Sequence, residues 1–219
     1  MEITWLGQSC FKIQDKNITL ITDPYNSELG LKPLHGLKAD IITMSHNHCD
    51  HNNIRAVSGV AEKSPLIVST PGEYEIQNVF IYGIPCFHDK EQGKQRGFNT
   101  IYLIKMSEIT VAHLGDLGHI LSDEQLEKIE KVDILLVPVG GTSTIDAKEA
   151  KQIISQIEPK IVIPMHYKIS GLKKNLDGID KFYSEMGAKK SEPISKFKIL
   201  KKDLISQTEM KMVEMENKH

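Results

Sequence analysis

The sequence contains few cysteines, and none are paired in a metal-binding or redox motif. Its three cysteines, Cys10, Cys49 and Cys86, form no CxxC pair, and their odd number argues against a disulfide framework. A reducing compartment is therefore expected, and we predict a cytoplasmic protein.

Long apolar runs are also missing. No stretch approaches the roughly 20 apolar residues that a membrane-spanning helix requires. Residues 1–10 (MEITWLGQSC) lack the basic start, apolar segment and small-residue cleavage site of a signal peptide. We therefore expect a soluble chain with no membrane partner.

A large net charge is absent as well. The formal net charge of −2 provides no overall field that would attract nucleic acid, so a nucleic-acid partner is not expected. The 219 residues, 40 % of them hydrophobic, suit one globular domain. Without repeats or linkers, we predict a single domain over residues 1–200. The charged C-terminal tail, 201–219, would be a dangling helix, a dimer contact or a frayed end.

The apolar pattern predicts a sheet-rich first half and a second half in which strands and helices alternate. Strands are expected at 3–7, 9–14, 17–23, 40–45, 65–69, 78–87, 98–106, 108–115, 133–139 and 160–167. Helices are expected at 122–132, 144–157 and 179–188. This order predicts an α/β fold, a four-layer αββα sandwich of two mixed sheets with helices on the outer faces.

The densest polar cluster is SHNHCDHNN, residues 45–53, directly after the strand expected at 40–45. Side chains two residues apart on an extended chain point the same way, so His46 and His48 could hold one ion together. Asp50 and His51 would lie at the following turn and could face a second point. Asn52 or Asn53 would then begin the next helix.

This donor set suits a transition-metal ion. Imidazole nitrogens with carboxylate oxygens favour zinc, with manganese, nickel or iron as alternatives, over calcium or magnesium. Four ligands within six residues cannot all reach one tetrahedral ion without strain. We therefore expect two divalent ions about 3.5–4 Å apart that share a bridging hydroxide.

More distant ligand candidates follow other predicted strands. His88, Asp116 and His166 each stand at the carboxyl end of a strand, where loops can converge on one rim. His113, three residues before Asp116, could compete with His88 for the third position on the first ion. Otherwise His113 and His119 would at most support the ligands.

Together, HxHxDH, a later histidine, Gly-Asp and a final strand-end histidine resemble the metallo-β-lactamase superfamily over nearly the whole chain. The segments WLGQSCFKI, LITDPY, HLGDLGH, DILLVPVGG and VIPMHY are most similar to a branch of small predicted zinc-dependent hydrolases that includes ascorbate-6-phosphate lactonases.

The resemblance implies specific ligand roles. It implies that one metal ion is held by His46, His48 and His88, and the other by Asp50, His51 and His166, with Asp116 bridging them. It also implies that Asp23, in ITDPY, supports the histidine loop from behind. Many members of the branch have Gly-His after the first strand, whereas this sequence has Gln8, an amide that ligates weakly.

Several residues near the proposed ligands have two possible interpretations. Cys49 could be a thiolate ligand, but its side chain should alternate away from the ligands, so packing is favoured. Gly140 and Gly141 could cradle a phosphate, although a tight turn is favoured.

Positions after His166, and two isolated histidines, carry weaker signals. Lys168, Lys173 and Lys174 could meet an anionic substrate or be solvated. We assign no function to His35 or His219.

These features predict a dinuclear metal-dependent hydrolase in which Asp50 is the catalytic residue that orients a metal-bridged hydroxide. The resemblance to this branch implies a small phosphorylated substrate, and a lactone, ester or phosphodiester bond would fit the machinery. Because the chain has no cap domain, loops or a second subunit of a homo-oligomer would shape the pocket. The alternatives are a catalytically silent metal-binding protein and a diiron redox protein on the same fold.

Overall fold

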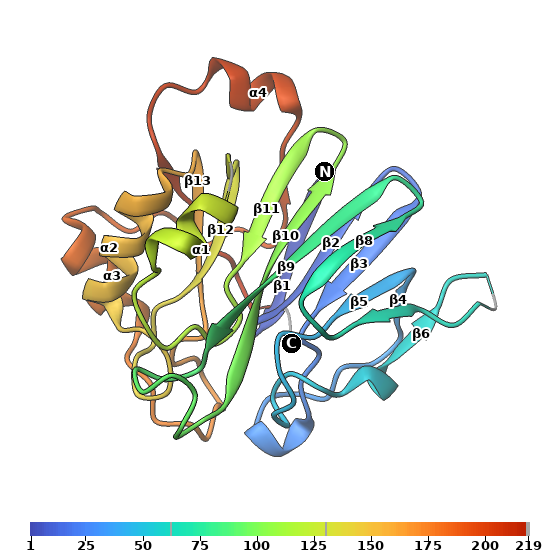
Figure 1. Cartoon of the computed structure of the whole chain (residues 1–219), viewed down its shortest axis with the longest axis horizontal. Helices are drawn as coiled ribbons and strands as arrows, with labels where there is room; N and C mark the ends of the chain where they lie inside the picture. Colours follow the sequence, from blue (N-terminus) through green and yellow to red (C-terminus); the bar gives the residue numbers. More distant parts are fainter. Residues whose placement is uncertain (62, 130, 218–219) are drawn as a thin grey trace.

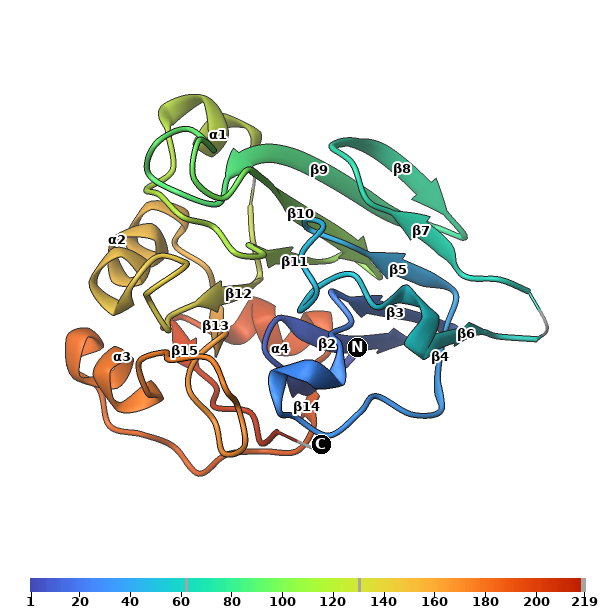
Figure 2. The ribbon, with the colours of Figure 1, turned by 90° about the horizontal axis from the view of Figure 1, so that it is seen from below.

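The computed structural model describes residues 1–61, 63–129 and 131–217, so His219 lies outside the described residues. Two large β-sheets pack face to face (Figures 1 and 2). The first sheet has the order β14-β1-β2-β3-β5-β7. Its strands are β1 (Glu2–Gly7), β2 (Cys10–Asp15), β3 (Ile18–Thr22), β5 (Ile41–Thr43), β7 (Leu66–Val68) and β14 (Phe197–Lys198).

The second sheet has the order β15-β13-β12-β11-β10-β9-β8. Its strands are β8 (Gly72–Ile76), β9 (Val79–Phe87), β10 (Phe98–Met106), β11 (Ile109–His113), β12 (Ile134–Pro138), β13 (Ile161–Met165) and β15 (Lys211–Met212). Strands β8 to β11 form an antiparallel meander, and β11, β12, β13 and β15 are parallel. Consequently β9, β11, β12 and β13 all end at the same edge of this sheet. A separate pair joins β4 (Leu37–Ala39) to β6 (Val57–Gly59).

The main core fills the space between the two sheets. Trp5 and Phe11 from the first sheet and Tyr102 from the second are at most 1 % exposed. The Tyr102 hydroxyl lies 3.1 Å from the carbonyl oxygen of Met44 and 3.2 Å from that of Val68. This contact ties the second sheet to the chain just before the histidine cluster.

The described residues also form four α-helices: α1 (Asp123–Lys128), α2 (Ala147–Ile157), α3 (Ile179–Met186) and α4 (Lys201–Ser206). Ser122 and Asp146 begin α1 and α2 with reciprocal capping boxes. Helices α2 and α3 lie beside β12 and β13, on the outer side of the second sheet (Figures 1 and 2), whereas Gln125 of α1 donates to the Pro85 carbonyl oxygen of β9. In the described part of the chain, no helix is long and apolar enough to cross a membrane.

The outer side of the first sheet is covered by a second apolar cluster. It draws Tyr25, Leu29 and Leu34 from the loop after β3, and Leu172 and Leu176 from the loop after β13. Two short 3-10 helices, η1 (Ser27–Leu29) and η2 (Ile54–Ala56), belong to the same layer. The predicted sandwich of two mixed sheets is confirmed.

Two predicted elements are shorter in the structure. The strand predicted at 40–45 ends at Thr43, because the chain turns before the histidines. The helix predicted at 122–132 ends at Lys128. Asn53 begins the next helix, as one of the two expected positions, but this helix is the 3-10 helix η2 and the Asn53 side chain forms no capping hydrogen bond.

Residues 201–217 are integrated into the main body. Helix α4 buries Leu204, and β15 pairs with β13. The domain boundary at residue 200 stays a prediction.

Candidate metal centre

The histidine cluster lies on a bent loop at the carboxyl end of β5. We expected the alternation of an extended strand to bring His46 and His48 together. The strand has already ended at Thr43, so alternation is not the cause. The loop bends through residues 45–48 and turns at 49–51, which brings the two imidazole rings to a centroid distance of 4.6 Å.

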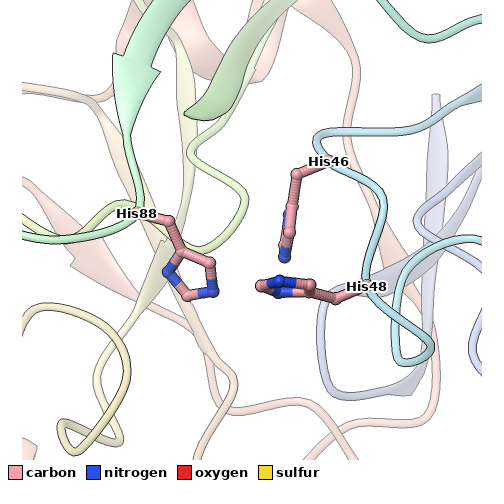
Figure 3. Close-up of side chains that lie close together, drawn as sticks. All are labelled: His46, His48 and His88. Atoms are coloured by element: carbon pink, nitrogen blue, oxygen red, sulfur yellow. The ribbon is translucent and has the colours of Figure 1, made fainter. Parts of the chain in front are cut away.

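The first ligand group combines this loop with the end of β9. Ligand atoms of His46, His48 and His88 all lie within 4.8 Å of one another. Figure 3 shows the three side chains converging from the two segments. His46 and His88 are buried, while His48 lies nearer to the surface. Such an arrangement can supply three imidazole nitrogens to one ion.

The second ligand group lies beside the first and is buried throughout. It contains Asp50, His51, Asp116 and His166, again with ligand atoms within 4.8 Å of one another. Asp116 follows β11 and His166 follows β13, so the parallel strands deliver both to the same edge. The sequence prediction placed all seven residues at one site, and the structure brings all seven together.

Asp116 contacts both groups. Its Oδ2 lies 3.4 Å from Nε2 of His88 in the first group and 3.3 Å from Nε2 of His166 in the second. The backbone N–H of Asp116 donates to Oδ1 of Asn99, a buried residue that the sequence reasoning missed. A carboxylate held in this position can link two cation sites.

Asp23 lies behind the histidine loop, fully buried. Its carboxylate accepts hydrogen bonds from the Ser45 backbone N–H at 2.7 Å and from the Ser45 hydroxyl at 2.6 Å. Nδ1 of His51 lies 2.9 Å from the same carboxylate, and Nδ1 of His46 lies 3.0 Å from the Ser45 hydroxyl.

These contacts select the tautomers of two histidines. Since the Ser45 hydroxyl donates to Asp23, it can only accept from His46, so the neutral imidazole carries its proton on Nδ1. His51 donates from Nδ1 directly to Asp23. Both rings therefore direct Nε2 towards the ligand groups, as expected for support behind metal ligands. The sequence reasoning missed Ser45.

The surroundings also set the protonation states. Burial lowers the pKa of His46 to about 3 and that of His88 to about 4, so both are neutral at physiological pH. Burial would also lower the pKa of His51, but the carboxylates of Asp116, Asp50 and Asp23 hold it well above its usual range. Burial opposes ionisation of Asp50, yet His51 and His166 keep the pKa of this carboxyl well below its usual value.

The residues present fit divalent metal ions. In the described structure, several buried ligand atoms have no hydrogen-bond partner: Nε2 of His46, Nε2 of His51, both ring nitrogens of His166 and Oδ2 of Asp116. Unpaired buried polar atoms are costly unless something else satisfies them. His51, protonated among three carboxylates, occupies a position where a cation is favoured. Both observations are accounted for if metal ions bind to the two groups.

The structure places His88, and not His113, beside His46 and His48. Both nitrogens of His113 are used elsewhere: Nε2 lies 2.8 Å from the Ser9 carbonyl oxygen, and Nδ1 accepts from the Gly115 N–H. His119 accepts from the Phe87 N–H at 3.1 Å and so supports the backbone just before His88.

Two minor expectations have different outcomes. Cys49 belongs to neither ligand group, but it is exposed and not packed in the interior, because the loop turns it outward. The Gly140–Gly141 turn approaches the ligand strand closely: a Cβ atom on Gly140 would lie 2.1 Å from the His166 carbonyl oxygen. Gly141 begins a tight turn over residues 141–144, closed by the Thr144 N–H on the Gly141 carbonyl oxygen, and Gly140 has a steric role beside His166.

The three lysines after His166 have different positions. Nζ of Lys168 donates to the carbonyl oxygens of Leu172 and Lys174, which fixes the loop. This fixed loop carries Lys174, whose ammonium forms an ion pair with Asp50, 124 positions away in the chain. Lys173 is exposed.

Gln8 adjoins the second group through its backbone. Its carbonyl oxygen accepts from the Trp5 indole at 2.8 Å and from the His166 N–H at 3.3 Å. Both amide atoms of its buried side chain have no hydrogen-bond partner within the described residues. Gln8 therefore positions the backbone of His166.

Comparison with known proteins assigns the family. The model of the beta-lactamase superfamily domain matches residues 2–166. Over 98 % of this chain and 97 % of the other, the fold matches a Thermotoga maritima protein with a TM-score of 0.78 and 34 % identity. That protein is assigned to the metallo-beta-lactamase superfamily. The chain therefore belongs to the metallo-β-lactamase superfamily, as its motifs had suggested.

Within the superfamily, the chain is a member of the UPF0173 group. A UPF0173 protein of Pyrococcus furiosus is 32 % identical over 194 residues, 76 % of this chain and 83 % of that protein. A UPF0173 metal-dependent hydrolase of Carboxydothermus hydrogenoformans is 29 % identical over 192 residues, 76 % of this chain and 84 % of that protein.

Proposed function

We propose that this protein is a hydrolase that uses two divalent metal ions, zinc in the first instance, to cleave a small phosphorylated lactone, ester or phosphodiester. The observation that carries the proposal is the adjoining pair of ligand groups, with three and four members, that meet at Asp116. The UPF0173 relatives described as metal-dependent hydrolases support the same reaction class.

Metal ions bound there would supply Lewis acidity, which lowers the pKa of water towards neutrality and stabilises negative charge on the substrate. The chain would hold them through His46, His48 and His88 on one side and Asp50, His51 and His166 on the other, with Asp116 between. Asp23 and Ser45 keep Nε2 of His46 and His51 free for this task.

Asp50 is the proposed catalytic residue. Because its pKa lies well below its usual range, the carboxylate is ionised at neutral pH and can accept a hydrogen bond from the attacking water. Lys174 adds a positive charge at Oδ2 of that carboxylate, the oxygen that also lies 3.2 Å from Nε2 of His51. Its ammonium holds Asp50 in one orientation, so the acceptor oxygen is preorganised before the substrate arrives.

The substrate is proposed to be a small molecule in the cytoplasm. The formal net charge of −2 provides no overall positive field that would attract a nucleic acid. A homo-oligomer in which a neighbouring subunit narrows the pocket is compatible with the same chemistry.

The test begins with protein purified without added metal. Elemental analysis should find about two equivalents of a transition metal, as expected for a two-metal hydrolase. The protein should hydrolyse at least one of bis-nitrophenyl phosphate, a lactone and a thioester. Asp50→Ala should abolish turnover, while Asp180→Ala, the same change at an exposed acid paired with Lys190, should leave it unchanged.

Two outcomes would refute the hydrolase. Bound metal without turnover on any of the three substrates would identify a silent metal-binding protein. Bound iron together with oxygen consumption would identify a diiron redox protein.

A further inference from the structure

A cavity of about 470 Å³ opens directly beside the first ligand group. His46 and His48 line one side of it, and Arg96, Phe98, Pro71 and Pro85 line the rest. This volume lies within the range of about 300–1,000 Å³ that is typical of small-molecule sites. A larger cavity of about 730 Å³, on the outer face of β8 to β10, is lined by none of the seven ligand residues. Of these two cavities, the smaller one would place a ligand next to the metal centre.

Arg96 is a cation without a partner in this cavity. In the described structure, its guanidinium forms no ion pair and no side-chain hydrogen bond, and the residue is exposed. Lys174, the cation on the other side of the centre, is already paired with Asp50. A guanidinium presents a planar fork of N–H donors that matches a carboxylate or a phosphate.

The loop that carries Arg96 is fixed by one buried carboxylate. Asp89, directly after His88, accepts hydrogen bonds from the backbone N–H groups of Glu91, Gly93, Gln95 and Arg96 at 2.7–3.0 Å. The contact from Arg96 itself is the shortest of the four. Asp89 therefore holds the Arg96 backbone in a defined position relative to His88.

Phe98 provides an apolar surface on the same wall. Its side chain is 73 % exposed, although it begins β10 beside a well-packed core. Its ring packs on Phe87 at a centroid distance of 5.8 Å, which limits its motion. Folding alone gains little from an aromatic ring in this position, whereas a ligand in the cavity would bury its free face.

We propose that Arg96 and Phe98 form the substrate-recognition wall of the metal centre. Arg96 binds an anionic group, a phosphate or a carboxylate, and Phe98 packs against an apolar part of the same molecule. The inference rests on the proposed function, because it names the substrate class of that site. The reacting bond would then lie on the side of His46 and His48.

The test uses the metal-loaded protein and two probes, phenylphosphonate, whose P–C bond resists hydrolysis, and inorganic phosphate. Calorimetric titration should show that Arg96→Gln weakens phenylphosphonate binding by about 10- to 100-fold, the effect of losing a charge-assisted contact. Lys94→Gln removes the same charge from an exposed site in the same loop that does not line the cavity. It should change binding by less than about two-fold.

Phe98→Ala separates the two contacts. It should weaken phenylphosphonate binding by about 2- to 10-fold and leave inorganic phosphate unchanged, since only the first probe carries a ring. Equal effects of Arg96→Gln and Lys94→Gln, or no effect of Arg96→Gln, would overturn the proposal. The proposal would also be overturned if the Phe98→Ala variant bound phenylphosphonate as tightly as the wild-type protein does.

Failure of the recognition wall can be distinguished from failure of the proposed hydrolase reaction. If the wild-type protein binds phenylphosphonate through Arg96 but hydrolyses none of the three substrates, the recognition wall is supported and the proposed reaction is refuted. If it hydrolyses a phosphorylated substrate and Arg96→Gln leaves KM unchanged, the reaction is supported and the recognition wall is refuted. Metal content must be equal in all variants, and Arg96 is exposed, so its replacement should not impair folding.

Discussion

Replacing Asp23 with asparagine should weaken metal binding at both ligand groups, although Asp23 lies behind them. The carboxylate accepts from the Ser45 N–H through Oδ1, and from the Ser45 hydroxyl and His51 through Oδ2. Asparagine has nearly the same shape but only one acceptor oxygen. The substitution therefore tests hydrogen bonding with little change in packing.

Each orientation of the new amide disturbs the site. If its NH₂ group takes the place of Oδ2, His51 and Ser45 must accept from it. The Ser45 hydroxyl would then donate to His46, and both imidazoles would move their proton to Nε2. If the NH₂ group takes the place of Oδ1, it faces the Ser45 N–H, and two donors oppose each other. Loss of such support typically costs about 10- to 100-fold in metal affinity, or about 1.4–2.7 kcal/mol.

The assay is a zinc titration in competition with a chelator, which measures a dissociation constant for each of the two bound zinc ions. Asp133→Asn is the matched control, because Asp133 is also buried and accepts from the Thr110 N–H and from Lys201, remote from the ligands. It should lower the melting temperature and leave both zinc affinities within about two-fold. If folded Asp23→Asn keeps wild-type affinity for both equivalents, the tautomer argument is refuted.

Three further predictions address the loops and the protonation states. Gly140→Ala should destabilise the protein by about 1–3 kcal/mol in urea and weaken one metal equivalent, since its Cβ would meet the His166 carbonyl oxygen at 2.1 Å. Gly178→Ala, where no atom lies within 4 Å, should do neither. Lys174→Met should lower kcat/KM by about 10- to 100-fold at unchanged metal content, because it removes a charge-assisted contact to Asp50. The control Lys173→Met, at an exposed position, should leave kcat/KM unchanged. Equal losses of kcat/KM in both variants would contradict the role of Lys174 in orienting Asp50. In the metal-free protein, the pKa values of His46 and His88 are about 3 and about 4, below the unfolded value of about 6.5. Between about pH 6 and 4.5 the unfolded chain therefore binds about 1.5 to 1.9 more protons at these positions, so the free energy of unfolding should fall by about 2–2.5 kcal/mol for each unit by which the pH is lowered. His88→Gln should halve that slope in urea titrations, and an unchanged slope would show that His88 is not neutral in the folded state.

The convergence of the candidate ligand residues could be predicted from the sequence because each follows a strand. His88, Asp116 and His166 stand where β9, β11 and β13 end, and parallel strands bring such positions to one edge. The two-sheet fold could be predicted for the same reason, since the apolar periodicity of the strands is strong. Local pattern and topology were enough for these features.

Other features depend on contacts that no local pattern encodes. Nothing in the sequence shows that both nitrogens of His113 are used by Ser9 and Gly115, which takes it out of the ligand set. The ion pair between Lys174 and Asp50 joins residues 124 positions apart. Cys49 was expected to pack inside, because no local pattern indicated that the strand ends at Thr43 and that the loop turns outward.

The composition of the two ligand groups has a consequence for how a substrate arrives. The seven side chains include only two carboxylates, Asp50 and Asp116, and the other five are histidines. Two divalent cations would therefore leave a surplus of about two positive charges at the centre, in a chain whose formal net charge is −2. A local field of this sign draws anions in from solution, so the association rate of an anionic substrate should fall steeply as salt is added, while that of a neutral one should not.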